Sequence, residues 1–498
     1  MTIDWADAKD LDDAISIARY EGGDYLIGVH IADVAEYVVE HTPLDTEAYL
    51  RGTSIYTPGR VIPMLPEILS NDRCSLHPGG PKLTLSIIMR VDSMGHIRES
   101  YVTESVIESM KKGVYDEVWE VLDAIEWSSG GSGENTVWVR WEQKSEGQSG
   151  RVYSPPKLLD TFGYKSIVTE SSYPPRDILR HFSDLYKILE KRRAKEWKIL
   201  FETTECYFDL DSDRNVRHIR KRERNDAHMM IEEFMVLANE EVAKWCQTKG
   251  IPFLSRVHDA PSAEKTREIQ ELISMDTMDR HGGMVSVEVS DRELTPHEIR
   301  TILEQARERG DIYRFSRLLL PKMSKAVYQD KKHRHFGLAL EYYAHFTSPI
   351  RRYPDLLLHR MIKKYLHSEL GKEKSEYAKN MKKWGISLSE KERAAEEISR
   401  SIDSLYMCRY MSWFVWQRFD GTISGLTESN IYVELASGVE GSIYIGKWAP
   451  RQIHLTLDMA RWALIDKTGA LIYRIGDTIR VNIREVDIEH RRIEMEAV

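Results

Sequence analysis

Five aspartates fall within ten residues near the start of the chain, in the segment TIDWADAKDLDDAI. Carboxylates at this density repel one another unless cations neutralise them. Ile3, Leu11, Ala14 and Ile15 place the acids in apolar surroundings, which argues against an ordinary solvated acidic turn. We therefore expect this segment to fold around bound cations, and the rest of the chain to be arranged about it.

The ligand chemistry of the segment favours one class of metal ion. Hard carboxylate oxygens in a tight loop suit Mg²⁺, with Mn²⁺ as the alternative. A calcium-binding EF-hand loop needs a central glycine and a terminal glutamate, and the segment contains no glycine. Two divalent ions held about 3.5–4 Å apart by carboxylates activate water and stabilise a leaving oxygen, which is the chemistry of phosphodiester hydrolysis.

A second motif, HFTSPIRRYPD at residues 345–355, supplies positive charge just before a predicted helix. Pro354 suits the first turn of that helix. An arginine such as Arg351, placed beside a metal pair, can clamp a phosphate and offset charge that develops in the transition state. A surface arginine pair bridged to acidic residues is the alternative that this motif alone leaves open.

Two other residues are candidates for contact with a nucleic acid. Tyr56 lies in the Pro/Gly-rich loop RGTSIYTPGRVIPMLPE, where its ring could stack on an unpaired base or simply pack in a turn. Glu232 shares a helix face with Met229 and Val236, and partly buried carboxylates are usually paired or functional.

Composition excludes several classes of protein. A net charge of −9 argues mildly against a protein that coats nucleic acid, but not against an enzyme with a locally basic channel. The four cysteines are scattered without a CxxC pair, so neither a disulfide framework nor a zinc knuckle is expected. No apolar run is long enough to span a membrane, and the N-terminus does not resemble a signal peptide. We expect a cytoplasmic, monomeric protein without membrane contact.

The pattern along the chain predicts an α+β fold. β-branched residues predict strands at 25–31 and 83–91, and apolar periodicity predicts helices at 178–200, 226–248, 262–275, 296–330, 353–367 and 388–415. A Ser/Gly tract at 128–133 opens a probable insertion over residues 126–175, which we do not expect to form part of the core.

After Trp416 the periodicity changes to two. Five short strands within about 80 residues, with a helical patch near 457–464, are typical of a small all-β OB-fold barrel over residues 416–498. A protein-docking β domain is the alternative for such a barrel.

Several long blocks, in order, resemble the ribonuclease II/ribonuclease R family of RNB exoribonucleases. The blocks are TIDWADAKDLDDAI, GVHIADVAEYV, RGTSIYTPGRVIPMLPEILSNDRCSLHP, DAHMMIEEFMVLAN and HFGLALEYYAHFTSPIRRYPDLLLHR. The resemblance implies an RNB catalytic domain over residues 1–410, a mixed sheet with surrounding helices. Residues 416–498 resemble the RNA-binding OB domain named after ribosomal protein S-one.

The resemblance also implies an activity. Its members are processive, metal-dependent 3′→5′ exoribonucleases that degrade single-stranded RNA to nucleoside 5′-monophosphates in RNA decay or processing. Members usually carry cold-shock-type OB domains before the acidic motif, which here begins at Thr2. The lysine-rich tail of some members is absent from this sequence, which puts the unwinding of structured RNA in doubt.

Site residues are carried over by position. The family's four metal-site aspartates correspond to Asp4, Asp10, Asp12 and Asp13, and Asp12 together with Arg351 and Glu232 forms the implied catalytic set. Tyr56 corresponds to the aromatic residue that clamps the 3′-terminal base, and Phe201 to the aromatic opposite it. Glu232, or else Glu233, corresponds to the acid near the terminal ribose, and Tyr115 is a candidate for contact with the RNA end.

Two other functions stay open at this point. One is a non-catalytic RNA-binding subunit of a decay complex, which would have no use for the complete set of aspartates. The other is a nuclease or phosphodiesterase that acts on DNA or on small nucleotides.

Overall fold

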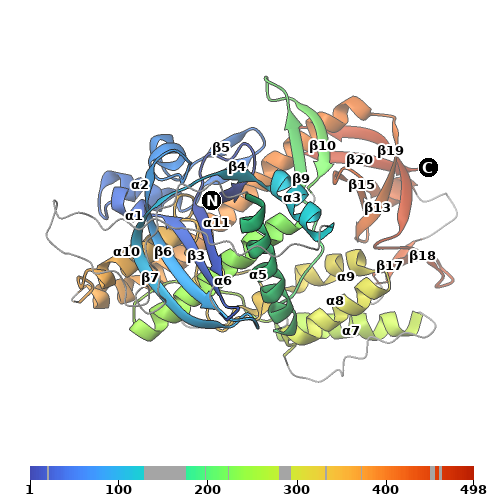
Figure 1. Ribbon diagram of the computed structural model, residues 1–498. Coiled ribbons are helices and arrows are strands. Elements are labelled where there is room, and N and C mark those ends of the chain that lie inside the picture. Colours follow the sequence, from blue (N-terminus) through green and yellow to red (C-terminus); the bar gives the residue numbers. More distant parts are fainter. Residues whose placement is uncertain are drawn as a thin grey trace.

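The computed structural model describes residues 1–19, 22–127, 175–196, 198–222, 224–279, 293–330, 334–371, 373–448, 455–458 and 462–498. Two large hydrophobic cores organise these residues, one around an antiparallel sheet and one around a group of helices and a barrel. Figure 1 shows the sheet at the left and the barrel at the right, with long helices between them.

The first core surrounds a four-stranded antiparallel sheet of order β2-β3-β6-β7. Its strands are β2 (Asp13–Arg19), β3 (Tyr25–Ala32), β6 (Pro81–Val91) and β7 (Ile97–Glu108). The helices of this core are α1 (Val34–Tyr37), α2 (Pro43–Arg51), α3 (Tyr115–Trp127), α5 (Pro175–Lys195), α6 (Asp226–Lys249), α10 (Tyr353–Leu366) and part of α11 (Lys374–Met411). The strands predicted at 25–31 and 83–91 are confirmed.

A short parallel pair fixes the start of the chain. Strand β1 (Thr2–Asp4) pairs with β8 (Lys112–Val114), with Asp4 opposite Val114. The backbones of Met1 and Ile15 also exchange hydrogen bonds, each of 2.9 Å, which join β1 to β2. The acidic segment is thus tied to the sheet on both sides.

The helix predicted at 226–248 is confirmed as α6. Asn225 caps its start, where its side chain accepts the His228 N–H, and Gly250 ends it with a φ of 63°. The helix predicted at 296–330 is instead broken. Gly310, with a φ of 75°, separates α8 (Pro296–Glu308) from α9 (Ile312–Leu319), because a left-handed residue ends a helix.

Two other predicted helices are confirmed, one of them with a much earlier start. α11 (Lys374–Met411) begins well before the predicted residue 388, and α7 (Ala263–Asp279) matches the predicted 262–275 closely. Val327–Gln329, inside the range predicted as helix 296–330, is strand β12, which pairs with β11 (Ser255–Val257). Sheet pairing with a distant segment overrides local helix periodicity there.

The C-terminal barrel is confirmed as a closed, five-stranded structure of order β13-β14-β15-β20-β19. Its strands are β13 (Arg418–Leu426), β14 (Asn430–Leu435), β15 (Glu440–Tyr444), β19 (Thr478–Asp487) and β20 (Arg492–Ala497). The helical patch predicted near 457–464 is wrong. β16 (Thr456–Asp458), β17 (Ala463–Ile465) and β18 (Leu471–Arg474) form a separate sheet, because β17 pairs on both of its edges.

A buried glutamate joins the barrel to the rest of the molecule. Glu434 of β14 accepts hydrogen bonds from Lys221 at 2.7 Å, Thr204 at 3.1 Å and Tyr313 at 3.2 Å, and also pairs with Arg317. These partners come from the hairpin of β9 (Cys206–Leu210) and β10 (Val216–Lys221), the segment before it, and α9. The second core continues from α7, α8 and α9 into the barrel, so the two predicted domains share one core.

Other expectations are answered within the described residues only. None of the helices there has the length and apolarity needed to cross a membrane. The insertion predicted at 126–175 lies outside the described residues except at its two ends, where α3 stops and α5 starts.

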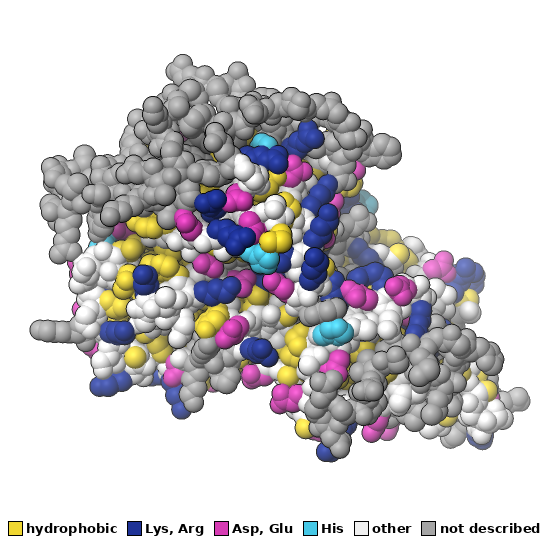
Figure 2. All heavy atoms as spheres, turned by 60° about the horizontal axis from the view of Figure 1, so that its bottom comes forward, with side chains coloured by type: hydrophobic (Ala, Val, Ile, Leu, Met, Phe, Trp, Pro, Cys, Tyr) yellow, Lys and Arg dark blue, Asp and Glu magenta, His cyan; other side chains and the backbone are white. Residues whose placement is uncertain are grey.

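On the face shown in Figure 2, basic and acidic side chains are interspersed, so any contact with a polyanion there is local.

Candidate active site

The acidic loop between β1 and β2 is held in place by its neighbours. Ser75 Oγ accepts the Leu11 N–H at 3.0 Å and donates to the Lys9 carbonyl at 2.7 Å. Lys112 Nζ donates to the carbonyls of Ala6 at 3.0 Å and Ala8 at 2.7 Å. Asp4 therefore ends one fixed strand and Asp13 begins another, with Asp10 and Asp12 on the braced loop between them.

Asp12 lies at the centre of the site and is buried. Its Oδ1 accepts the Ile350 N–H at 2.8 Å, across a sequence separation of 338 residues. Its Oδ2 is buried without a hydrogen-bond partner, and Arg351 Nε lies 3.7 Å away from it. Burial raises the pKa of Asp12 well above its ordinary value, although Arg351 and the Ile350 N–H oppose this. Burying a carboxylate oxygen without a hydrogen-bond donor costs free energy unless a cation binds that oxygen.

The neighbouring acids show the same lack of compensation. Burial, together with the charge of Asp4, raises the pKa of Asp13 to about 7. Burial also raises the pKa of Asp4, and the charge of Asp10 adds to that effect. Hard, desolvated carboxylates that lack a full complement of protein cations are the donor set that divalent magnesium or manganese fits.

The four aspartates do not converge on a single point. Among the described residues, the group that offers three acidic ligand atoms within 4.8 Å of one another is Asp33, Glu36 and Glu104, not the aspartates. The ligand oxygens of the aspartates are therefore spaced more widely than those of that group.

Hydrogen bonds join the backbone of Arg351 to the loop before Tyr56. The Arg351 carbonyl accepts the Ser54 N–H at 2.9 Å and the Thr53 hydroxyl at 3.0 Å. Arg351 Nη2 donates to Ser348 Oγ at 3.1 Å. The guanidinium is half exposed beside Asp12, which leaves it able to meet an anion at the rim of the site.

Tyr56 lies on β4 (Ile55–Thr57), which forms a hairpin with β5 (Arg60–Ile62). Its hydroxyl donates to Asp10 Oδ2 at 2.6 Å, while the residue as a whole is exposed. Desolvation of the hydroxyl end raises the pKa of Tyr56, so the group stays protonated and keeps donating to Asp10. The structure thus brings an exposed ring to the edge of the aspartate group.

Tyr115 begins α3 and belongs to an aromatic stack that the sequence did not reveal. Its ring stacks on His228 with centroids 3.9 Å apart, and Trp5 contacts both, at 5.3 Å from Tyr115 and 4.5 Å from His228. The Arg222 guanidinium lies 3.7 Å from the Trp5 ring centroid. The available signals were weak: His228 lies in the quoted block DAHMMIEEFMVLAN, and Trp5 interrupts the aspartates.

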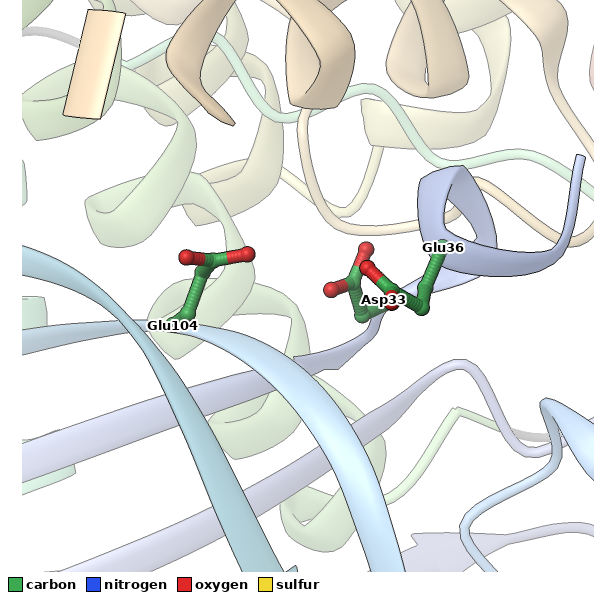
Figure 3. A group of neighbouring side chains, drawn as sticks. All are labelled: Asp33, Glu36 and Glu104. Carbon is green, nitrogen blue, oxygen red and sulfur yellow. The ribbon is translucent and has the colours of Figure 1, made fainter. Parts of the chain in front are cut away.

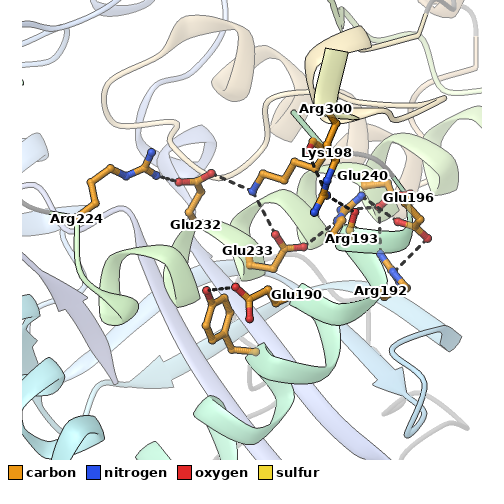
Figure 4. A network of polar contacts seen from close by, with 11 residues as sticks. Glu190, Arg192, Arg193, Glu196, Lys198, Arg224, Glu232, Glu233, Glu240 and Arg300 are labelled. Atoms are coloured by element: carbon orange, nitrogen blue, oxygen red, sulfur yellow. Dashed lines mark hydrogen bonds and ion pairs between the residues drawn. The ribbon is translucent and has the colours of Figure 1, made fainter. Parts of the chain in front are cut away.

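The adjacent glutamates of α6 have different surroundings (Figure 4). The Glu232 side chain is 37% exposed and pairs with Lys198 at 3.2 Å and with Arg224. The Glu233 side chain is 4% exposed and pairs with Arg193 at 2.8 Å and Lys198 at 3.4 Å. Glu233 is therefore locked inside the protein, and Glu232 is the one that a ligand can reach.

Phe201 is a predicted site residue for which the described part of the chain shows no contact with the aspartates or with Tyr56. It is partly buried against the second core. No ring contact joins Phe201 to Tyr56 in the described part of the chain. Its role opposite Tyr56 stays a prediction.

A second acidic group lies at the end of the main sheet (Figure 3). Asp33 and Glu36 come from the start of α1, and Glu104 from β7. Lys363 Nζ lies 2.5 Å from Asp33, 2.7 Å from Glu36 and 3.1 Å from Glu104. The position that a metal ion would take is thus filled by the ammonium group of α10.

Comparisons with known proteins show the family to which the chain is similar. Residues 1–368 match the RNB domain model. Over 507 residues the chain is 33% identical to ribonuclease R of Escherichia coli, covering all of this chain and 56% of that protein. It is 32% identical to ribonuclease R of Thermotoga maritima, covering 98% of this chain and 62% of that protein. The chain therefore spans little more than half the length of these relatives.

Solved structures show the same fold. Mycoplasma genitalium RNase R in complex with ribose-methylated single-stranded RNA matches with a TM-score of 0.83 and 25% identity, covering all of this chain and 70% of that one. Yeast Ssd1, described as a pseudonuclease, matches with a TM-score of 0.60 and 18% identity over 97% of this chain and 52% of its own, which shows the fold alone. With the RNB model matched over most of its length and ribonuclease R sequences aligned from end to end, the chain belongs to the RNB domain family.

Proposed function

We propose that the chain is a metal-dependent exoribonuclease that hydrolyses single-stranded RNA processively from the 3′ end to nucleoside 5′-monophosphates. The observation that carries this proposal is the buried Asp12, whose Oδ2 has no donor and lies 3.7 Å from Arg351. That oxygen and that guanidinium, next to an exposed tyrosine, combine a cation-binding carboxylate, a phosphate clamp and a base contact in one place.

Asp4, Asp10, Asp12 and Asp13 would hold the divalent ions, Mg²⁺ or Mn²⁺. When bound, such ions lower the pKa of a water molecule and stabilise charge on the leaving 3′ oxygen. The raised pKa values of Asp4, Asp12 and Asp13 support this assignment, because bound cations would balance the negative charge that nearby basic side chains do not.

The chain's own residues would then position the RNA. Arg351 binds the oxygens of the scissile phosphate and stabilises the charge that grows on them. The Tyr56 ring stacks on the 3′-terminal base, with Phe201 as the partner on the opposite face, and so holds that phosphate at the aspartates. Glu232 and Tyr115 would accept or donate a hydrogen bond at the 2′-hydroxyl, the group that separates RNA from DNA.

A 5′-labelled single-stranded RNA, incubated with Mg²⁺, tests the proposal. We expect stepwise shortening from the 3′ end to a short limit product, release of 5′-monophosphates, and no such products with Asp12→Asn. A 5′-labelled DNA of the same sequence serves as the control and should stay intact. Internal cleavage fragments, or equal degradation of the DNA, would contradict the proposal.

A non-catalytic RNA-binding function is the second candidate, since the fold is shared with a protein described as a pseudonuclease. The same assay separates the two. An RNA-binding subunit would retain the label at full length, and Asp12→Asn would leave the protein's affinity for RNA and its response to Mg²⁺ unchanged.

A further inference from the structure

Two tryptophans at the junction of α11 and β13 are the most exposed large hydrophobic side chains of the described residues. Trp413 is 82% exposed and Trp416 is 72% exposed. Neither indole makes a side-chain hydrogen bond or a ring contact with another described residue. Exposed apolar groups of this size, unpartnered and close together in the chain, mark a surface that contacts something else.

The residues between them anchor the junction. Phe414 packs on Tyr410, with centroids 4.9 Å apart, and on Phe419 at 6.0 Å. Phe414 and Val415 both pack against the second core. The inward side chains therefore fix the segment, and the two exposed indoles extend from a fixed backbone.

The backbone of Trp416 is strained. Its φ is 70°, its N–H donates to the Ile483 carbonyl at 2.7 Å, and the Ile483 N–H donates to the Gln417 carbonyl at 3.1 Å. Trp416 and Gln417 therefore both oppose Ile483 in a bulge whose left-handed residue is ordinarily glycine. A bulky side chain in that conformation is sterically strained, and so exposed an indole gains little free energy by burial.

The charges beside the tryptophans match a polyanion. Arg418 continues β13 directly from this bulge, and Arg484 follows Ile483 on the paired strand β19. Both are exposed, and neither lies within ion-pair distance of a carboxylate among the described residues. Asp420, on the same two strands, is already paired with Arg480 at 2.9 Å.

We propose that Trp413 and Trp416 form a stacking platform for unpaired RNA bases outside the aspartate pocket, with Arg418 and Arg484 contacting the phosphates. The inference rests on the proposed function, to which it adds a second contact with the same strand. Indole faces accept any base, so the platform adds affinity without sequence preference. It gives a role to a residue held in a strained backbone conformation.

Equilibrium binding tests the platform in the full chain carrying Asp12→Asn, so that the RNA is not consumed. The probe is a labelled oligouridylate of about 30 nucleotides, several times the length that one OB fold covers. We expect Trp413→Ala and Trp416→Gly each to raise the Kd by about 5- to 100-fold, the equivalent of one stacked base. Leu50→Ala, which removes an exposed apolar side chain from α2 far from the barrel, is the matched control and should not change the Kd.

Thermal unfolding of the same variants separates the platform from a structural role. Trp416→Gly should leave the melting temperature unchanged or raise it, because glycine relieves the left-handed backbone. A lower melting temperature, or an unchanged Kd in both tryptophan variants while the Asp12→Asn chain binds the probe, would reject the platform and leave the proposed function standing. If the Asp12→Asn chain does not bind the probe and the unmodified chain does not shorten it, the proposed function fails and the platform with it.

Discussion

Two acidic groups among the described residues differ in one respect: the group with the better metal-like geometry is the one that already has its cation. Asp33, Glu36 and Glu104 bring three oxygens within 4.8 Å of one another, but Lys363 fills the space between them. Burial acts to raise the pKa of Glu104, but Lys363 and His367 together hold that pKa below its usual value. The aspartates of the N-terminal loop are spread more widely, and burial raises the pKa values of three of them.

The comparison shows that charge balance, rather than the spacing of the oxygens, distinguishes the two groups. The Lys363 ammonium group pairs with all three carboxylates of the first group and so joins α10 to α1 and β7. The second group has the half-exposed Arg351 at its edge and Lys112 beside Asp4, and neither offsets the effect of burial on the pKa of Asp4. A cation that binds from solution would compensate negative charge in the second group, whereas Lys363 already occupies its place in the first.

The largest expected effect comes from removing one charge from the second group. Asp12→Asn should lower the rate of RNA hydrolysis by about 10⁴-fold, since metal-bound carboxylates contribute several kcal/mol to the transition state. Folding should persist, because the Asn Oδ1 can still accept the Ile350 N–H. Single-turnover kinetics and thermal unfolding measure the two. Asp7→Asn, an exposed acid of the same loop, is the control and should keep most of the activity.

Removing the cation from the first group should affect stability instead. Lys363→Met leaves three carboxylates without this partner, of which Asp33 is buried and Glu104 partly buried, and should cost about 3–5 kcal/mol of unfolding free energy in a urea titration. Mn²⁺ should restore part of that loss, because the variant group then resembles the aspartates. Lys364→Met, which breaks more exposed pairs with Glu40 and Glu373, should cost about 1 kcal/mol or less. Equal losses in the two variants would remove the distinction between the groups.

Tyr56 sharpens the comparison, because only the second group carries an exposed ring. Tyr56→Ala should raise KM for single-stranded RNA by about 5- to 100-fold, the value of one stacked base. Tyr56→Phe keeps the ring and loses only the hydrogen bond to Asp10, so its KM should stay within a few-fold of the parent. If Tyr56→Phe were as impaired as Tyr56→Ala, the hydroxyl rather than stacking would be the important feature.

The smallest effect is a dependence of stability on pH in the absence of metal. The pKa of Asp13 is about 7 in the folded chain, against about 4 when unfolded, so its stabilising contribution is complete below pH 4 and is lost as the pH rises through 7. In EDTA the melting temperature should therefore fall between pH 5 and pH 8, and fall less in Asp13→Asn. Mg²⁺ should flatten the profile of the unmodified chain. A profile that is the same with and without Asp13 would contradict this assignment.

The sequence predicted the parts of the site that follow from residue type and motif. The aspartate loop, Arg351 and Tyr56 were each proposed from their motifs, and the structure brings Asp12 and Arg351 to 3.7 Å. The periodicity of α6 and the alternation in the barrel strands predicted those elements because local pattern and tertiary packing agree there.

The rest depended on contacts that no local pattern encodes. The stack of Trp5, Tyr115 and His228 joins three separate elements and could not be read from any one of them. Strands β16, β17 and β18 replaced a predicted helical patch because pairing decided their conformation. Lys363 lies in a helix predicted correctly, yet its place among three carboxylates follows only from how α10 packs on the sheet.

Direct counting of bound Mn²⁺ by electron paramagnetic resonance tests the central claim most closely. We predict that the unmodified chain binds Mn²⁺, that Asp12→Asn loses most of this binding, and that Glu36→Gln, in the group occupied by Lys363, keeps it in full. Binding that survives Asp12→Asn, or that disappears in Glu36→Gln, would place the ions in the other group and contradict the account.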